Sequence, residues 1–306
     1  MSKKSVTAYQ LPWIFIFVTP ALVLTIVFTL APALTLLSYS LFSWESFKRG
    51  GFVGIDNFTK LLKFPFREDF LGAFQNNFVV FLSLFIIQTS LGLLLALAIY
   101  RLKRGKKVFQ AVVFLPVILS LIIVAFMWKL FLDPLFGPVS AIAIEMNWTW
   151  LNQPWLGQPG LALFTLIFIG IWRWVGFPAI VFLAGMNSIN EEFLEAAQID
   201  GASEFQIFRK IIFPLLAPSF TIVAILTFIG AFEWFELPYV IGGVTGQPGG
   251  STTTMALLFY RLAFGTVDSA TVDVGLSSAI GVILFIFVGI GAALGSYYLR
   301  KREVQQ

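Results

Sequence analysis

Six long runs of apolar residues constrain the fold of this chain more than any other feature. Roughly 20 apolar residues in a helix are needed to cross about 30 Å of hydrocarbon. The sequence therefore predicts an all-α, polytopic membrane protein with six transmembrane helices. The runs fall near residues 12–36, 78–100, 108–131, 161–185, 215–240 and 275–299.

Composition agrees with this class and excludes several chemistries. Of the 306 residues, 58% are hydrophobic and only 12% are charged, whereas soluble domains are roughly 45–50% apolar. The chain has no Cys and no His, which excludes disulfides, thiolate chemistry, Cys/His metal sites and histidine proton relays. We therefore expect no metal or cofactor to be bound by this chain.

The first run has an alternative interpretation as a signal peptide. Lys3 and Lys4 precede it, and Ala31-Pro32-Ala33 resembles a cleavage site. The apolar core of a signal peptide is only about 7–15 residues long, however, and this run continues to Phe42. A transmembrane helix is therefore favoured.

Lysine and arginine residues predict how the chain is oriented. Twelve lie on one side of the six runs and six on the other, and basic residues are enriched in cytoplasmic loops. We expect a multi-pass protein of the cell (inner or plasma) membrane, with both termini cytoplasmic and one domain over residues 1–306. The net charge of +4 then reflects orientation and does not require a nucleic-acid partner. The richer side comprises Lys3, Lys4, Arg101, Lys103, Arg104, Lys106, Lys107, Arg209, Lys210, Arg300, Lys301 and Arg302.

The segment between the fourth and fifth runs, residues 188–213, has the pattern of two short helices, and we call it the elbow. Residues 188–191 and 203–206 each match a capping box, and Gly201 suits the end of the first helix. Pro214 suits the first turn of the next helix. The sequence predicts a cytoplasmic helix-turn-helix.

The elbow is acidic and two-sided, which indicates what it contacts. Its five acidic and two basic residues give a net charge of minus three, and an anionic leaflet repels such a segment. Its apolar positions recur at helical spacing and need a contact. A protein partner is one interpretation, and an interfacial link between two spans is the other. The apolar positions are Phe193, Leu194, Ala197, Phe205, Phe208, Ile211 and Ile212.

The pattern Glu195-Ala-Ala-x3-Gly201-x9-Ile211-x-Phe213-Pro214 resembles the cytoplasmic signature loop of permease subunits in binding-protein-dependent ABC importers. Only Phe213 departs from it, because Leu is usual there. The resemblance implies the type I permease fold and a coupling helix that docks on a separate ATPase subunit. The coupling residues that it implies are Glu191, Glu195, Ala196, Ala197, Asp200 and Gly201.

Four further stretches are similar to the carbohydrate branch of that family, the relatives of maltose and glycerol-phosphate permeases. They are residues 52–58, 133–137, 172–178 and 249–254. The resemblance implies a sugar substrate, a second homologous permease, two copies of a cytoplasmic ATPase that binds ATP and Mg, and an extracytoplasmic solute-binding protein.

The chain itself shows no pattern for ATP hydrolysis. No G-x-x-x-x-G-K-[ST] sequence occurs, so no P-loop is available to bind nucleotide phosphates. No serine, cysteine or carboxylate arrangement suggests catalysis either. We expect a transport subunit rather than an enzyme.

Charged residues within the apolar runs are candidates for function, because ionisable groups are costly there. Arg173, Glu233 and Glu236 could hydrogen-bond a polar solute, with neighbouring Trp side chains stacking on sugar rings. Alternatively, Arg173 pairs with one of the glutamates, or these groups reach the outer interface.

Helical spacing extends this candidate site. Trp172 and Gly176 share one face of the fourth run, and Thr227, Ala231 and Trp234 share one face of the fifth. Ordinary helix packing is the alternative for each residue. The resemblance to maltose-type permeases places the sugar site on these two helices. The full predicted set is Ser120, Trp172, Arg173, Gly176, Thr227, Ala231, Glu233 and Trp234.

Two other functions are compatible with parts of the sequence. A secondary transporter driven by an ion gradient would use Glu233 and Glu236 as ion or proton sites. A membrane scaffold would use the elbow to recruit a partner but would leave the polar helix faces without a role.

Overall fold

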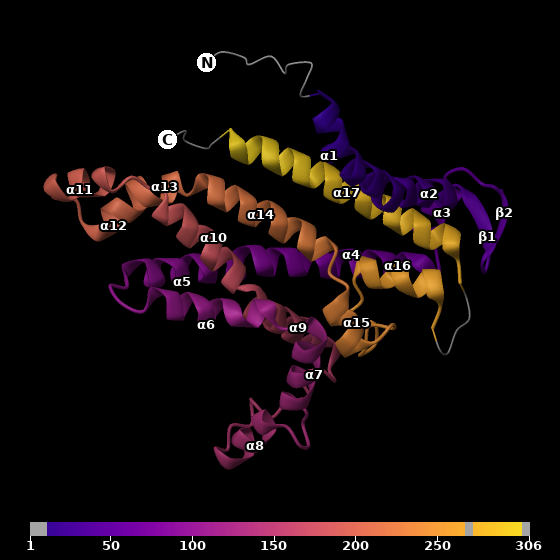
Figure 1. Cartoon of the computed structure of the whole chain (residues 1–306). Helices are drawn as coiled ribbons and strands as arrows, with labels where there is room; N and C mark the ends of the chain where they lie inside the picture. Colours follow the sequence, from indigo (N-terminus) through magenta and orange to yellow (C-terminus); the bar gives the residue numbers. More distant parts are fainter. Residues whose placement is uncertain (1–10, 267–271, 302–306) are drawn as a thin grey trace.

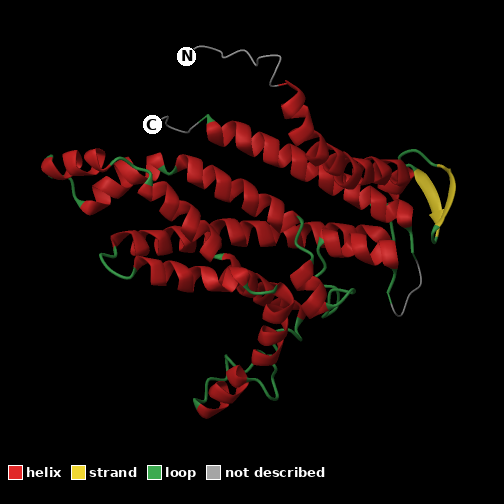
Figure 2. Ribbon diagram, viewed as in Figure 1, coloured by secondary structure: helices red, strands yellow, loops and turns green. Residues whose placement is uncertain are grey.

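The computed structural model describes residues 11–266 and 272–301. Within these ranges the chain is mostly helical, with one small two-stranded sheet (Figures 1 and 2). Five helices are long and apolar enough to cross a membrane, and a sixth span results if one sharply bent pair is counted as a single span. The predicted six-helix architecture agrees with this count.

The first span is one continuous helix over the described residues. It comprises α1 (Leu11–Thr25), a π-helical turn (Ile26–Leu30) and α2 (Ala31–Ser40). The α2 segment packs along the C-terminal helix α17 (Val274–Arg300). An antiparallel hairpin, β1 (Phe42–Glu45) and β2 (Lys48–Phe52), and the short helix α3 (Asp56–Lys60) follow.

The second span is much longer than its apolar run. It joins α4 (Phe66–Ser83), a π-helical turn (Leu84–Gln88) and α5 (Thr89–Arg101) into 36 helical residues. The apolar run predicted only residues 78–100, because the first part of α4 carries charged and amide side chains.

The third run, predicted as one helix over 108–131, is instead broken. Helices α6 (Lys106–Ile118) and α7 (Leu121–Phe131) meet at 90°. Pro116 lies in the last turn of α6 and lacks an N–H for the helical hydrogen bond. Leu119 and Ser120 then adopt extended conformations, with ψ of 141° and 131°.

After α7 the chain forms a turn that leads into α8 (Pro138–Glu145), which projects away from the bundle (Figure 1). Asp133 Oδ1 accepts hydrogen bonds from the N–H groups of Leu135 at 2.9 Å and Phe136 at 3.0 Å. These two bonds lower the pKa of Asp133 below its ordinary value. Gly137 completes the turn, because a Cβ there would lie 2.5 Å from the carbonyl oxygens of Phe131 and Asp133.

The fourth span is the most buried of the five long helices. It consists of α9 (Pro159–Trp174) and α10 (Gly176–Asn187), and α10 lies along α5 and α6. The fifth span contains α14 (Ala217–Phe232) and α15 (Glu236–Gly242), with a break between them. Helix α16 (Met255–Phe264), which the sequence did not predict, follows before α17.

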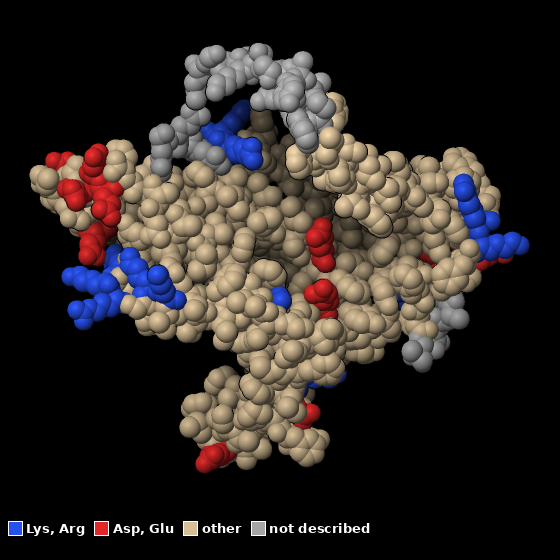
Figure 3. All heavy atoms as spheres, in the orientation of Figure 1, with Lys and Arg blue, Asp and Glu red and all other residues tan. Residues whose placement is uncertain are grey.

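The loops assigned to one side by their basic residues do lie together. The turn between α5 and α6, the elbow and the C-terminal end of α17 share one end of the molecule, and the β-hairpin lies at the other (Figure 1). Charged side chains gather towards these ends, and most of the surface between them is uncharged apart from acidic atoms near the centre and charged atoms on the part that projects below (Figure 3). Many apolar side chains of the spans are exposed, among them Phe17 at 76% and Phe28 at 73% in the first span.

Candidate functional site

The elbow forms the predicted helix-turn-helix. Its helices are α11 (Glu191–Ile199) and α12 (Glu204–Ile207), and a π-helical turn (Phe208–Ile212) and α13 (Phe213–Leu215) connect it to α14. Pro214 lies at the start of α13, as expected. Only the turn at Leu216 separates the elbow from the fifth span.

One of the two predicted capping boxes is wrong. Ser188 Oγ donates to the carbonyl of Gly185 at 2.8 Å and closes α10, so it does not cap α11. The N-cap of α11 is Asn190, whose Oδ1 accepts from the N–H of Glu192 at 3.1 Å. The second box is confirmed, because Ser203 Oγ accepts from Gln206 N and Gln206 Oε1 accepts from Ser203 N.

Gly201 ends α11 in the predicted way. Its φ of +76° is a left-handed conformation, which glycine adopts without steric cost. The N–H of Gly201 donates to Gln198 at 3.0 Å, and the N–H of Ala202 donates to Ala197 at 2.9 Å. This pair of bonds is a Schellman motif, and it sets the angle between α11 and α12.

One face of the elbow is fixed to the bundle. Ile189, Ile207 and Ile212 are buried in a cluster with residues of α5 and α10. Arg101 and Glu204 form an ion pair at 3.0 Å, but both side chains are mostly exposed, so the pair contributes only about 0–1 kcal/mol. Apolar packing is therefore the main contact that holds the elbow to the spans.

The other face of the elbow is free within the described chain. The five acidic side chains are exposed, and four of them, all except Glu204, form no ion pair within the described residues. Three large apolar side chains lie exposed among them: Phe193 at 53%, Ile199 at 87% and Phe205 at 68%. Red atoms concentrate at this tip in Figure 3. Exposed apolar groups within a charged rim are typical of a protein docking surface. Of the predicted coupling residues, Glu191, Glu195, Ala196, Asp200 and Gly201 are exposed, and Ala197 is half-buried.

A second region of interest lies where the third and fifth spans are broken. Trp172, Trp234 and Leu119 pack against the same apolar cluster. Arg173 Nη2 donates to the carbonyl of Leu119 at 3.1 Å, which satisfies a backbone group left free by the break. Predicted site residues from the fourth and fifth spans thus meet beside Ser120, which is exposed at the N-terminus of α7.

The charged residues of this region are not paired with one another. In the part of the chain that the structure describes, Arg173 forms no ion pair with Glu233 or Glu236. The Arg173 guanidinium lies 5.0 Å from the ring centre of Trp174. Glu233 follows the last turn of α14, Glu236 opens α15, and both are exposed. Their carboxylates are thus available to a solute or to a partner.

The remaining predicted residues are occupied by packing inside this chain. Ala231 is fully buried against side chains of α4 and α9, and Thr227 is 9% exposed. Gly176 permits α10 to approach α6, because a Cβ there would lie 2.3 Å from the carbonyl oxygen of Val113. Trp234 lies against Gly170 of α9. A role for these residues in solute binding stays a prediction.

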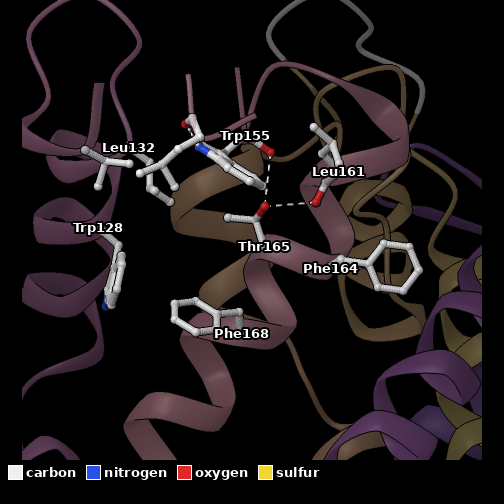
Figure 4. Close-up of a pocket in the computed structure, with 9 residues that line it drawn as sticks. Trp128, Leu132, Trp155, Leu161, Phe164, Thr165 and Phe168 are labelled. Atoms are coloured by element: carbon white, nitrogen blue, oxygen red, sulfur yellow. Dashed lines mark hydrogen bonds between the residues drawn. The ribbon is translucent and has the colours of Figure 1, made fainter. Parts of the chain in front are cut away.

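An apolar pocket of about 430 Å³ lies between α7, α8 and α9 (Figure 4). The hydroxyl of Thr165 is already bonded to the carbonyls of Leu161 and Trp155, whereas the buried Nε1 of Trp128 has no hydrogen-bond partner among the described residues. The sequence did not predict the pocket, because its residues meet only through the 90° bend before α7. They are Trp128, Leu132, Val139, Leu151, Trp155, Leu161, Phe164, Thr165 and Phe168.

Residues 88–304 match the family described as "Binding-protein-dependent transport system inner membrane component". The chain belongs to this family. The resemblance carried by the elbow is therefore confirmed, and the protein is a membrane permease. A permease of this family is a transport subunit, in agreement with the absence of a catalytic pattern.

Similar proteins transport sugars, according to their names. The permease is 28% identical to the probable starch degradation products transport system permease protein AmyD of Thermoanaerobacterium thermosulfurigenes, over all of both chains. It is 32% identical to the multiple sugar-binding transport system permease protein MsmF of Streptococcus mutans, over 95% of this chain and 97% of that one. It is also 32% identical to the trehalose/maltose transport system permease protein MalF of Thermococcus litoralis, over 90% and 89%.

Solved structures confirm the fold. A bacterial ABC transporter involved in the import of the acidic polysaccharide alginate contains a chain that superposes with a TM-score of 0.79, at 24% identity, over 94% of the permease and 95% of that chain. The predicted importer permease fold is thus confirmed.

Proposed function

We propose that the permease is the transmembrane subunit of an ATP-driven, binding-protein-dependent importer of sugars, with a monosaccharide, oligosaccharide or sugar-phosphate as its substrate. Similarity to sugar permeases over nearly the whole chain carries the proposal. The free, acidic face of the elbow supports it, because a chain without a P-loop needs a contact through which energy from ATP enters.

The elbow transmits this energy. An ATPase subunit that binds ATP and Mg contacts the free face of α11, and its movement displaces the elbow. Because Ile207 and Ile212 are buried against the bundle, the elbow cannot move without its surroundings. The short connection through α13 and Leu216 then passes the displacement to α14 and to the break at the end of that helix.

The predicted assembly contains a second, homologous permease, two ATPase subunits and an extracytoplasmic solute-binding protein. The exposed apolar surface of the first span supports a further membrane partner or lipid, since the span from Phe15 to Ser40 has no buried residue in its apolar window. The elbow and both termini are placed in the cytoplasm, as the distribution of basic residues predicts. The β-hairpin then lies on the outer side.

Reconstitution tests the proposal. The permease is co-expressed with its partner permease, ATPase and binding protein, and the complex is placed in proteoliposomes with radiolabelled maltose or trehalose as probes. Uptake is expected to require ATP and to persist when a protonophore collapses the proton gradient. Uptake that stops with the gradient while ATP is present would instead identify a secondary transporter, and absence of uptake of any sugar would reject the proposal.

A further inference from the structure

The break in the fifth span leaves several carbonyl groups without their usual helical donors, among them those of Ala231 and Trp234. Helix α14 ends at Phe232, so the carbonyl of Ala231 lies in the last turn, where no intrahelical N–H is available. The helical donor to the carbonyl of Trp234 would be residue 238, which is Pro238 and has no N–H. A break at membrane depth persists only where neighbouring groups satisfy such carbonyls.

Two side chains from elsewhere in the chain bond to these carbonyls. Asn77 Nδ2 donates to Ala231 O at 2.6 Å, and Thr254 Oγ1 donates to Trp234 O at 2.7 Å. Both residues have 0% relative exposure. Asn77 lies on α4, and Thr254 is the residue just before α16. The break is thus held by the second span and by the connection to α16.

Each of these side chains has a second hydrogen bond that fixes its direction. Asn77 Oδ1 accepts from the N–H of Met255 at 2.7 Å. Thr254 Oγ1 accepts from the N–H of Leu257 at 3.3 Å as the N-cap of α16. These second bonds therefore fix the direction of the amide and the hydroxyl towards the carbonyls of Ala231 and Trp234.

The neighbouring Asn76 binds the loop between α15 and α16 to the same helix. Its Nδ2 donates to the carbonyls of Ser251 at 3.0 Å and Thr253 at 2.8 Å. The loop is also packed closely against the end of α15, because a Cβ on Gly242 would lie 2.4 Å from Thr252 Oγ1. One rigid unit therefore joins α4, this loop and the break.

We propose that Asn77 and Thr254 are positioning residues that hold the fifth span broken between α14 and α15. Between these helices the backbone no longer follows a helix, so the direction of Trp234 and of the two glutamates depends on the break. Trp234 is directed against Gly170 of α9. Any effect of this arrangement on solute passage rests on the proposed function. The structural role, in which Asn77 and Thr254 hold the break, does not depend on it.

Hydrogen–deuterium exchange of the assembled complex tests the structural role. The variants are Asn77→Leu, which removes both amide bonds at similar volume, and Thr254→Val, which removes the hydroxyl. Thr254→Ser restores the hydroxyl, and Gln75→Leu on the exposed side of α4 is the matched control. Both disruptive variants are expected to raise exchange about fivefold to tenfold in peptides covering residues 231–241. Thr254→Ser and Gln75→Leu are expected to match the unmodified permease.

Two results would overturn the proposal: unchanged exchange in 231–241, or an equal rise in the remote elbow peptide 191–199, which would indicate general loosening. If the Asn77→Leu complex does not assemble, the comparison of Thr254→Val with Thr254→Ser still tests the proposal. Sugar uptake is measured in parallel, and a rise in KM with Thr254→Val that Thr254→Ser reverses is expected. A complex with no ATP-driven uptake at all would reject the proposed function, while the exchange result would still decide the role of the two residues.

Discussion

Gly201 shows how a single backbone conformation can control the elbow. No atom lies within 4 Å of a Cβ built at this position, so a larger side chain has space. The left-handed φ of +76° is instead the constraint, and it costs a residue with a Cβ about 1–2 kcal/mol, with Asn the best tolerated.

Gly201→Val is therefore expected to distort the Schellman turn and to lower ATP-driven uptake severalfold while ATP hydrolysis continues. Gly201→Asn is expected to retain most of the uptake. The ratio of sugar imported to ATP hydrolysed, measured in proteoliposomes, checks this. Equal uptake in the two variants would show that the backbone conformation of Gly201 is not what couples the elbow.

The N-terminus of α11 shows where a residue pattern misleads. The spacing of Ser188 and Glu191 fits a capping box, but the buried Ile189 is held in the bundle core and the helix begins two residues later than the pattern indicates. At Ser203 and Gln206 the same pattern is correct, because no buried residue competes for the cap. Local patterns thus predicted the elbow and the end of α11 at Gly201, whereas tertiary packing determined the residue at which α11 begins.

A pair of alanine substitutions separates the two possible caps. Asn190→Ala is expected to destabilise α11 by about 1 kcal/mol and to raise hydrogen exchange in residues 191–199. Ser188→Ala is expected to leave exchange in this peptide unchanged, because its hydroxyl bonds to α10. The opposite result would restore Ser188 as the cap of α11.

At the scale of helices, the apolar runs predicted how many spans exist but not where they bend. Hydropathy measures the length of an apolar run and carries no information on direction. Pro116 and Pro238 mark the two breaks, but a proline alone does not distinguish a break from the tolerated start of a helix. The partners that stabilise the breaks, Arg173 and Asn77, come from other spans and could not be paired with them from sequence alone.

The free face of α11 leads to a prediction about charge. Reversing Glu191, Glu195 and Asp200 to Lys is expected to abolish co-purification of the ATPase, because a docking site that accepts an acidic helix would now meet three cations. Glu145→Lys on the exposed α8 is the control and is expected to leave the complex intact. Retention of the ATPase by the triple variant would exclude this face as the docking surface.

At the scale of the whole molecule, the candidate solute region is surrounded by more negative than positive charge. Glu233 and Glu236 are exposed at the break, while Arg173 already donates to the carbonyl of Leu119. These two exposed carboxylates repel an anionic solute that passes near them. Among the sugars considered, the local charge therefore favours neutral ones over sugar-phosphates.

The double variant Glu233→Gln and Glu236→Gln tests this preference. With one binding protein held constant, the ratio of anionic to neutral sugar imported is expected to rise severalfold in the variant, because only the permease has changed. Glu145→Gln on α8 is the matched control and should leave the ratio unaltered. The binding protein selects solutes before they reach the permease. The contribution of the break is therefore isolated by comparing the anionic-to-neutral ratio between variants, rather than the absolute rates of import. An unchanged ratio would show that the solute passes away from these glutamates. It would also argue against a role of the neighbouring Trp234 in solute passage.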